Sequence, residues 1–400
     1  MELSYKHTKL ACYLGYFYQA SVITFLPLLF TIFQSRFGIS YAKLGLLVTI
    51  NFATQMTVDI TAFRLVNRIG YRASMILSAG LCMVGFSMIS LLPHIMPPYA
   101  GLCIAVVIYA SGGALTDIVV NPLLSALPIV DPKKRSAELS LLHSVFCWSQ
   151  VVLIIGTTLL VRVLGERLWW IIPLLLAAVP LINFLLFLRV PVPAVTEEEE
   201  RTTARGLFSN KLFLLMCVGM MCAGAIELIM GQWASTFAEN ALHLNKTAGD
   251  LIGPCMLALT MGIGRTVYGF WGDRMDLIHA MILGGLGSLA CYLLVSFSYN
   301  PVVDIIGCAL VGFCVSFMWP GIMSVCADHI PSGGAAMFAL LAVFGDSGGS
   351  IGPAIAGAIT DACGGDLHKG LLLGILYSVI ILVFLFHYKR TYQKKPPEQI

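Results

Sequence analysis

The chain has 400 residues, of which 58% are hydrophobic and 11% are charged. Soluble domains carry about 25% charged residues, so this composition argues against an ordinary soluble protein and for a polytopic membrane protein. A net charge of +3, scattered along the chain, gives no indication of nucleic-acid binding. Twelve cysteines include no C-x-x-C pair and mostly fall within apolar runs, so we predict core side chains rather than disulfides or metal ligands.

Twelve apolar segments are each long enough to cross a bilayer as a helix, which takes about 20 residues. In chain order they are 8–33, 42–66, 73–92, 98–127, 137–163, 168–189, 211–239, 247–272, 277–298, 301–328, 333–361 and 367–388. The first segment runs on without a small-residue cleavage site, so we interpret it as a span rather than a signal peptide.

A hydrophilic stretch between the sixth and seventh segments divides them six and six. We therefore predict an all-α membrane protein with 12 transmembrane helices in two six-helix bundles, 1–190 and 211–390. Residues 191–210 are predicted as a cytoplasmic linker and 391–400 as a cytoplasmic tail. If the N-terminus is cytoplasmic and the spans alternate, most Lys and Arg residues fall on the cytoplasmic side, as the positive-inside rule requires. We predict a monomer in the cell membrane with both termini in the cytoplasm.

The two halves of the chain match each other at intervals, which indicates an internal repeat. An offset of 206 residues aligns Asn67-Arg68 with Asp273-Arg274. An offset of 198 aligns Asn121-Pro122 with Trp319-Pro320, and also Val145-Phe146 with Val343-Phe344. Two six-helix halves in the same orientation are one established plan for secondary transporters.

These features resemble the major facilitator superfamily along the whole chain. Its G-x-x-x-D-R-x-G loop motif is similar to Gly269, Asp273 and Arg274, with a degraded copy around Asn67 and Arg68. The segment from Asp117 to Asn121-Pro122 resembles the acid-x-x-x-Asn-Pro pattern of the bacterial fucose-permease-like branch, whose members are sugar:proton symporters. Segments 141–150, 226–239, 317–324 and 342–353 are similar to the same branch. Its members are expected to use a second acid in the first span, where this chain has Gln19 and tyrosines.

Five charged residues lie deep within predicted spans: Asp59, Asp117, Glu227, Arg265 and Asp346. A charge at the bilayer centre costs about 2.5–3.5 kcal/mol on insertion scales, so such residues normally face a bundle interior or a wet cavity. Asp117, Glu227 and Asp346 are candidates for binding substrate or a proton. Alternatively, an acid pairs with a neighbouring helix, and for Glu227 the candidate partner is Arg265.

Polar and aromatic residues near these acids complete a candidate substrate- and proton-binding set. Asn121 shares a helix face with Asp117, and an indole such as Trp233 can stack on the apolar face of a sugar while an amide bonds its hydroxyls. The full set is Asp117, Asn121, Glu227, Gln232, Trp233, Asp346, His143, Trp148, Gln150 and Trp319.

A second set lies nearer the cytoplasmic loops. Asp59 and Arg265 occupy equivalent places at the offset of 206 residues, and Arg68, Asp273 and Arg274 belong to the loop motif. We predict gating or structural roles for these charges rather than substrate contact.

The function predicted from the sequence is secondary active transport of a small polar solute, a sugar or sugar-like compound, by proton-coupled symport and alternating access. Burial favours the neutral form of a carboxylate, so Asp117 or Glu227 would carry the proton. The alternatives are an exporter of amphipathic compounds and a membrane sensor without flux. We predict no enzyme activity and no cofactor, because the glycine run at 261–269 follows no strand. The expected partners are the solute, protons and the lipid bilayer.

Overall fold

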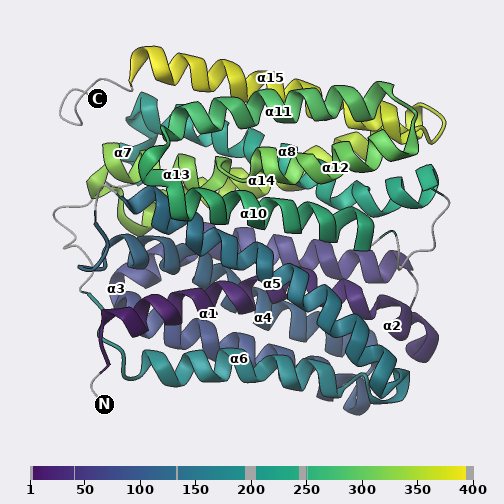
Figure 1. The fold of residues 1–400 in the computed structure, drawn as a ribbon. Helices are drawn as coiled ribbons and strands as arrows, with labels where there is room; N and C mark the ends of the chain where they lie inside the picture. The colour runs from purple at the N-terminus through teal and green to yellow at the C-terminus, as the bar shows by residue number, and fades with distance from the viewer. Residues whose placement is uncertain are drawn as a thin grey trace. The chain divides into compact units, whose positions relative to one another are not determined.

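The computed structural model describes residues 3–39, 41–131, 134–193, 204–242, 249 and 251–392. Those residues form helices and connecting turns, with no strand among them. The chain divides into two compact units (Figure 1). Unit 1 comprises Met1–Asp131 and Ser149–Glu199, and unit 2 comprises Pro132–Trp148 and Glu200–Ile400. The predicted boundary at 191–210 stays a prediction, because 194–203 lie outside the described residues.

Unit 1 is a bundle of antiparallel helices. Its elements are α1 (Tyr5–Thr24), η1 (Leu26–Leu29), α2 (Phe30–Phe37), α3 (Tyr41–Ile95), α4 (Pro98–Ser125), the second half of α5 (Arg135–Leu164), η3 (Glu166–Leu168) and α6 (Ile171–Phe187). At one end, Thr8 Oγ1 near the start of α1 donates to the Pro191 carbonyl after α6 over 2.6 Å. At the other end, the Trp169 ring before α6 stacks on His94 near the end of α3.

α3 contains both the second and the third predicted spans. Gly70 separates them with φ 81° and ψ 168°, in the left-handed region that favours glycine. The chain therefore turns at Gly70, two residues after the Asn67-Arg68 pair of the internal repeat. Arg72, just after the turn, donates from Nη1 to the Phe187 carbonyl at the end of α6 over 3.0 Å.

The first predicted span, 8–33, is not one continuous helix. α1 ends at Thr24, a 3-10 turn follows over Leu26–Leu29, and α2 begins at Phe30. Pro27 has no backbone N–H and cannot continue the helical ladder. The last carbonyls of α1 therefore need other donors.

Unit 2 is a second antiparallel bundle. Its elements are the first half of α5, α7 (Ala204–Ser209), α8 (Lys211–Leu242), η5 (Leu251–Cys255), α10 (Met256–Trp271), η6 (Gly272–Arg274), α11 (Leu277–Phe297), α12 (Pro301–Val315), α13 (Met318–His329), η7 (Pro331–Gly333), α14 (Gly334–Ala362) and α15 (Leu367–Thr391). Lys389 near the end of α15 donates to His279 at the start of α11 over 2.6 Å. At the opposite end, His368 Nδ1 lies 2.7 Å from the Val295 carbonyl.

The tenth predicted span is also broken, between α12 and α13. Pro320 lacks the N–H that would bond the carbonyl four residues earlier, which is that of Ser316. The helix is interrupted at Ser316 and Phe317. This break exposes a backbone acceptor inside the apolar part of unit 2.

Glycines bring α8 and α14 into backbone contact. A Cβ atom added to Gly224 would collide with the Gly345 carbonyl, and one added to Gly348 would collide with the Met221 carbonyl. The two helices lie side by side in unit 2 (Figure 1). This contact positions the stretch of α8 that carries Glu227.

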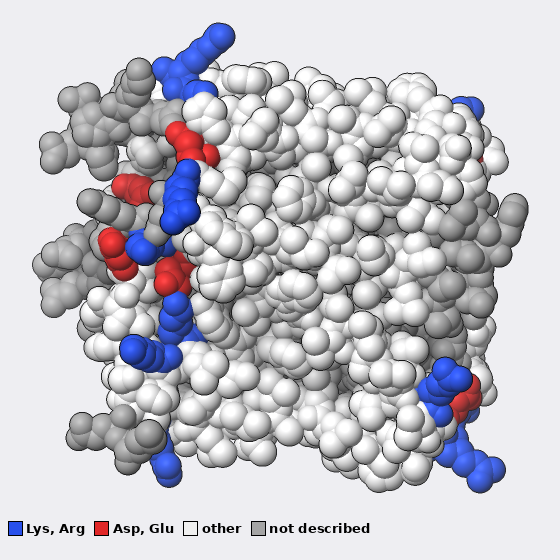
Figure 2. All heavy atoms as spheres, in the orientation of Figure 1, with Lys and Arg blue, Asp and Glu red and all other residues white. Residues whose placement is uncertain are grey.

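Among the described residues, nine helices are long and apolar enough to cross a membrane. They are Leu65–Ile95, Pro98–Ser125, Arg135–Leu164, Lys211–Ala234, Leu251–Trp271, Leu277–Phe297, Pro301–His329, Ala336–Thr360 and Leu367–Thr391, with Ile171–Phe187 as a shorter apolar helix. On the face shown in Figure 2, described Lys, Arg, Asp and Glu side chains lie near helix ends and leave the middle of the helices uncharged. The prediction of an all-α membrane protein is confirmed, and the twelve predicted spans are consistent with it.

All twelve cysteines lie in the described part of the chain and are free thiols. Cys363, in the turn between α14 and α15, is exposed, whereas Cys103 and Cys314 are half-buried and the others are buried. The prediction that most cysteines are core side chains is consistent with this burial.

Candidate functional site

The side chain of Asp117 in unit 1 is hydrogen-bonded by a side-chain amide. It lies on α4 and is half-buried, and its Oδ2 accepts a hydrogen bond from Gln19 Nε2 on α1. Gln19 Nε2 also donates to Gln55 Oε1 on α3 over 3.0 Å. The first span, for which the resemblance implies a second acid, thus presents the amide of Gln19 to Asp117.

The amides continue as a chain towards the end of α1. Gln55 Nε2 donates to Asn51 Oδ1 over 3.0 Å, and Asn51 Nδ2 donates to the Val22 carbonyl over 2.7 Å. Gln19, Gln55 and Asn51, hereafter the amide chain, are each at most 4% exposed. Val22 lies in the last turn of α1, where carbonyls lose their helical donors, and Asn51 supplies one.

Asn121 lies one helical turn after Asp117 and is 1% exposed. Its Nδ2 donates to the Tyr16 hydroxyl over 2.8 Å and to the Asp117 carbonyl over 3.2 Å. On the neighbouring face, Thr116 Oγ1 donates to the Tyr18 hydroxyl over 3.0 Å. The polar side chains of α4 are thus tied to α1.

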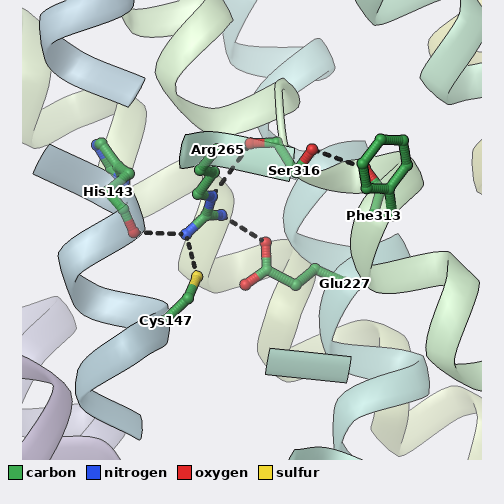
Figure 3. A network of polar contacts seen from close by, with 6 residues as sticks. All are labelled: His143, Cys147, Glu227, Arg265, Phe313 and Ser316. Carbon is green, nitrogen blue, oxygen red and sulfur yellow. Dashed lines mark hydrogen bonds and ion pairs between the residues drawn. The ribbon is translucent and has the colours of Figure 1, made fainter. Parts of the chain in front are cut away.

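Arg265 in unit 2 is the centre of a second polar network (Figure 3). It lies on α10 and is 2% exposed. Its Nη2 lies 3.4 Å from Glu227 Oε2 on α8, and Nη1 donates to the His143 carbonyl over 3.3 Å and to Cys147 Sγ over 3.1 Å. A guanidinium offers five N–H donors, so one side chain joins α8 and the first half of α5.

The backbone break between α12 and α13 provides a further acceptor for Arg265. Its Nε donates to the Ser316 carbonyl over 3.1 Å. This is the carbonyl that Pro320 deprives of a helical donor. The position of a proline in one helix therefore helps to fix a buried cation on another.

The Arg265–Glu227 pair is shielded from water, with side-chain exposures of 3% and 15%. Removing either partner from such a pair leaves an uncompensated buried charge. The sequence offered this pairing as the alternative to a functional Glu227, and the structure contains it. Glu227 can thus contribute a fixed charge in this arrangement.

The candidate residues on α5 divide between the units. Trp148 is exposed and donates from Nε1 to Thr266 Oγ1 over 2.9 Å in unit 2. Gln150 belongs to unit 1, where its Nε2 donates to Thr24 Oγ1 over 3.2 Å. Ser140 Oγ donates to the Arg265 carbonyl over 2.8 Å.

The remaining substrate candidates lie on α8, α13 and α14 of unit 2. Trp233 is half-buried and donates from Nε1 to the Pro353 carbonyl over 3.1 Å, and Gln232 beside it is exposed. Asp346 and Trp319 are half-buried. The Trp319 ring lies against α14 at Gly345, where a Cβ atom would overlap it.

The predicted gating charges lie in different environments. Asp59 on α3 is 2% exposed, whereas Arg68 and Arg274 are exposed. Asp273 belongs to η6, and its side chain lies outside what the structure describes. In the described part of the chain, no group of three or more His, Cys, Asp and Glu side chains could hold a metal ion.

Sequence reasoning missed the uncharged partners. Gln55 and Asn51 were not candidates, although they lie four residues apart in an apolar stretch, the spacing that places two side chains on one helix face. Tyr16, whose hydroxyl accepts a hydrogen bond from Asn121, was not a candidate either. A search of the spans for amides at helical spacing, rather than for charges alone, could have found Gln55 and Asn51.

The sequence profile of the Major Facilitator Superfamily matches residues 12–353 and 247–399. A search of the curated proteins found no match. Among solved structures, the transporter FucP in its outward conformation is similar with a TM-score of 0.79 and 17% identity, over 94% of this chain and 97% of that chain. The E. coli fucose:proton symporter FucP is similar with a TM-score of 0.77 and 16% identity, over 96% of this chain and 98% of that chain.

Two other solved transporters share the fold. The proton:xylose symporter XylE, bound to 6-bromo-6-deoxy-D-glucose, gives a TM-score of 0.81 and 12% identity over 98% of this chain and 96% of that chain. A bacterial homologue of the iron transporter ferroportin, in an outward-facing state, gives a TM-score of 0.75 and 14% identity over 96% of this chain and 99% of that chain.

The apolar helices and the family match together define an integral membrane protein of the secondary transporter class. The chain belongs to the Major Facilitator Superfamily. The resemblance stated from the loop motif and the acid-x-x-x-Asn-Pro pattern is confirmed at this level, and the expectation that the protein is a transporter rather than an enzyme is confirmed with it.

Proposed function

We propose that this protein is a proton-coupled symporter of a small, hydroxyl-rich solute, and that Asp117 carries the proton. The single observation that carries the proposal is the contrast between the partners of two half-buried acids. Asp117 meets the neutral amide of Gln19, whereas Glu227 meets the guanidinium of Arg265.

Proton transfer has different consequences at the two acids. Protonating Glu227 would leave the charge of Arg265 uncompensated in an apolar environment. Protonating Asp117 removes a charge without stranding an opposite one at Gln19. Asp117 is therefore the better group to gain and lose a proton as the site opens to either side of the membrane.

The candidate residues in both units suit a polar solute. Amides such as Gln150 and Gln232 can bond hydroxyls, and the indoles of Trp233 and Trp319 can stack on the apolar face of a sugar ring. FucP and XylE, which share the fold, are symporters of fucose and xylose with protons. These points favour a sugar or sugar-like compound as the solute.

We propose that the termini face the cytoplasm. In unit 2, Arg135 pairs with Asp328 at the end of α13 over 2.9 Å, and Lys389 near the end of α15 bonds His279 at the start of α11 over 2.6 Å. Lys369 lies at the opposite end, at the start of α15. The cationic end is expected to be cytoplasmic.

The test uses purified protein in proteoliposomes with an imposed inward proton gradient and labelled L-fucose and D-xylose as probes. Wild type should accumulate at least one sugar, with alkalinisation of the medium. Asp117→Asn should lose accumulation but retain sugar counterflow. Asp276→Asn, at an exposed cap outside the spans, is the matched control and should accumulate sugar as wild type does.

Two results would overturn the proposal. One is gradient-driven accumulation by Asp117→Asn at the wild-type level, which would remove Asp117 from the role. The other is the absence of sugar flux together with export of an amphipathic dye, which would favour the exporter.

A further inference from the structure

The Val22 carbonyl fixes which atom of each amide in the amide chain donates and which accepts. A backbone carbonyl can only accept hydrogen bonds, so Val22 requires Asn51 to present Nδ2. Asn51 Oδ1 then faces Gln55, which must donate to it from Nε2. Gln55 Oε1 in turn faces Gln19, which must donate and therefore also presents a donor to Asp117. A donor is the group that suits an ionised carboxylate.

We propose that Gln19, Gln55 and Asn51 act as positioning residues that carry the protonation state of Asp117 to the contact between α3 and the last turn of α1. The inference rests on the proposed role of Asp117 as the proton carrier. When Asp117 takes a proton from water, it gains an O–H donor that faces Gln19. Gln19 then rotates its amide to present Oε1, and Gln55 and Asn51 rotate in turn.

The reversal cannot be completed at the far end. After it, Asn51 would present Oδ1 to the Val22 carbonyl, and two acceptors cannot bond each other. The hydrogen bond that joins α3 to the end of α1 is lost. Protonation of Asp117 is thereby converted into release of a contact next to the helix break at Pro27.

A second observation supports the reversal. Gln19 Oε1 is buried and has no hydrogen-bond partner among the described residues. It lies against Gly113, where any Cβ atom would overlap it, so the missing side chain leaves room for the amide. A buried acceptor without a partner is costly. In the reversed chain, Oε1 would accept from protonated Asp117.

Other titratable groups face this region from the helices packed against α4. They are Tyr16 and Tyr18 on α1, which bond Asn121 and Thr116, and Cys82 and Asp59 on α3. Asp59 lies one helical turn beyond Gln55. A titration signal must therefore be assigned to Asp117 by substitution rather than by position.

The test is infrared difference spectroscopy of the full-length protein in nanodiscs across a pH series. In wild type, a carboxyl band that Asp117→Asn abolishes should titrate together with a side-chain amide band. Asn51→Leu and Gln55→Leu each free the chain from its fixed end, so each should make Asp117 bind its proton about tenfold more tightly, a rise of about one pH unit in the midpoint. Ser78→Ala removes a buried hydroxyl of α3 outside the chain and should leave the midpoint unchanged.

Wild-type midpoints in both Asn51→Leu and Gln55→Leu would overturn the inference while leaving Asp117 as the proton carrier, since Gln19 would then act only locally. Uncoupled carboxyl and amide bands in wild type would also overturn it, whether or not the variants fold. If Asp117→Asn abolishes no band, the proposed function fails and this inference fails with it.

Discussion

Asp117 in unit 1 and Glu227 in unit 2 are both carboxylates within membrane-crossing helices, and they differ in what meets them. Asp117 is bonded by the neutral amide of Gln19, while Glu227 lies 3.4 Å from a buried guanidinium nitrogen of Arg265. An amide can present either a donor or an acceptor, but a guanidinium only donates. The comparison teaches that two half-buried carboxylates in membrane-crossing helices can have partners of different charge, one a neutral amide and the other a cation.

The largest expected effect concerns the cation of unit 2. Arg265→Met would leave Glu227 charged without a partner and deprive the Ser316 carbonyl of its donor. Breaking a buried pair costs about 3–5 kcal/mol, so the midpoint of thermal unfolding in detergent should fall steeply. The exposed Arg390→Met, near the end of α15 in the same unit, is the control, with a change within about 0.5 kcal/mol. Equal loss in both variants would show that the Arg265 network does not stabilise unit 2.

The second prediction tests the two acids directly. Glu227→Gln strands the charge of Arg265 and should cost about 3 kcal/mol. Asp117→Asn keeps an oxygen that can accept from Gln19, so it should cost less than about 1 kcal/mol. Thermal unfolding of both variants under the same conditions measures the difference. The opposite order of stability would contradict the proposal that Glu227 is held by its ion pair while Asp117 exchanges a proton.

The third prediction concerns how Glu227 is positioned. Gly224→Ala places a Cβ atom against the Gly345 backbone, which has no room to yield. Overpacking of this kind costs about 1–3 kcal/mol. Gly231→Ala, on the same helix, is the matched control, because its Cβ atom would meet only Leu228 at 3.9 Å. Similar stability of the two variants would show that α8 and α14 are less closely packed than described.

The smallest expected effect concerns unit 1. Tyr16→Phe removes the hydroxyl that accepts from Asn121 and should cost about 1 kcal/mol. A double-mutant cycle with Asn121→Ala should give a coupling energy of about 0.5–1 kcal/mol, as expected for residues in contact. Additive losses would mean that the bond between α1 and α4 contributes nothing to stability.

Composition and hydropathy were sufficient to predict the helical membrane fold, because the bilayer imposes both length and apolar character on each span. The same patterns predicted continuous helices at 8–33 and 301–328, whereas Pro27 and Pro320 break them. A proline in a span is visible in the sequence, but whether the helix kinks or ends depends on which neighbours satisfy the freed carbonyls.

The site was only partly predictable for a related reason. Charged residues such as Asp117 and Arg265 stand out in an apolar segment, so the sequence was sufficient to predict them as candidates. Gln55 and Asn51 carry no charge, so they do not stand out in the sequence. They join the site only because α3 places Gln55 against Gln19 of α1. His143 was chosen for its ring, yet Arg265 bonds its backbone carbonyl, a group that every residue has.

The exposed thiol of Cys363 gives the native chain a built-in handle for membrane-impermeant maleimides. Its turn lies before the start of α15, at the opposite end of that helix from Lys389. Labelling of intact cells would therefore reveal which side of the membrane this turn faces, with no engineered cysteine and little background from the eleven less accessible thiols.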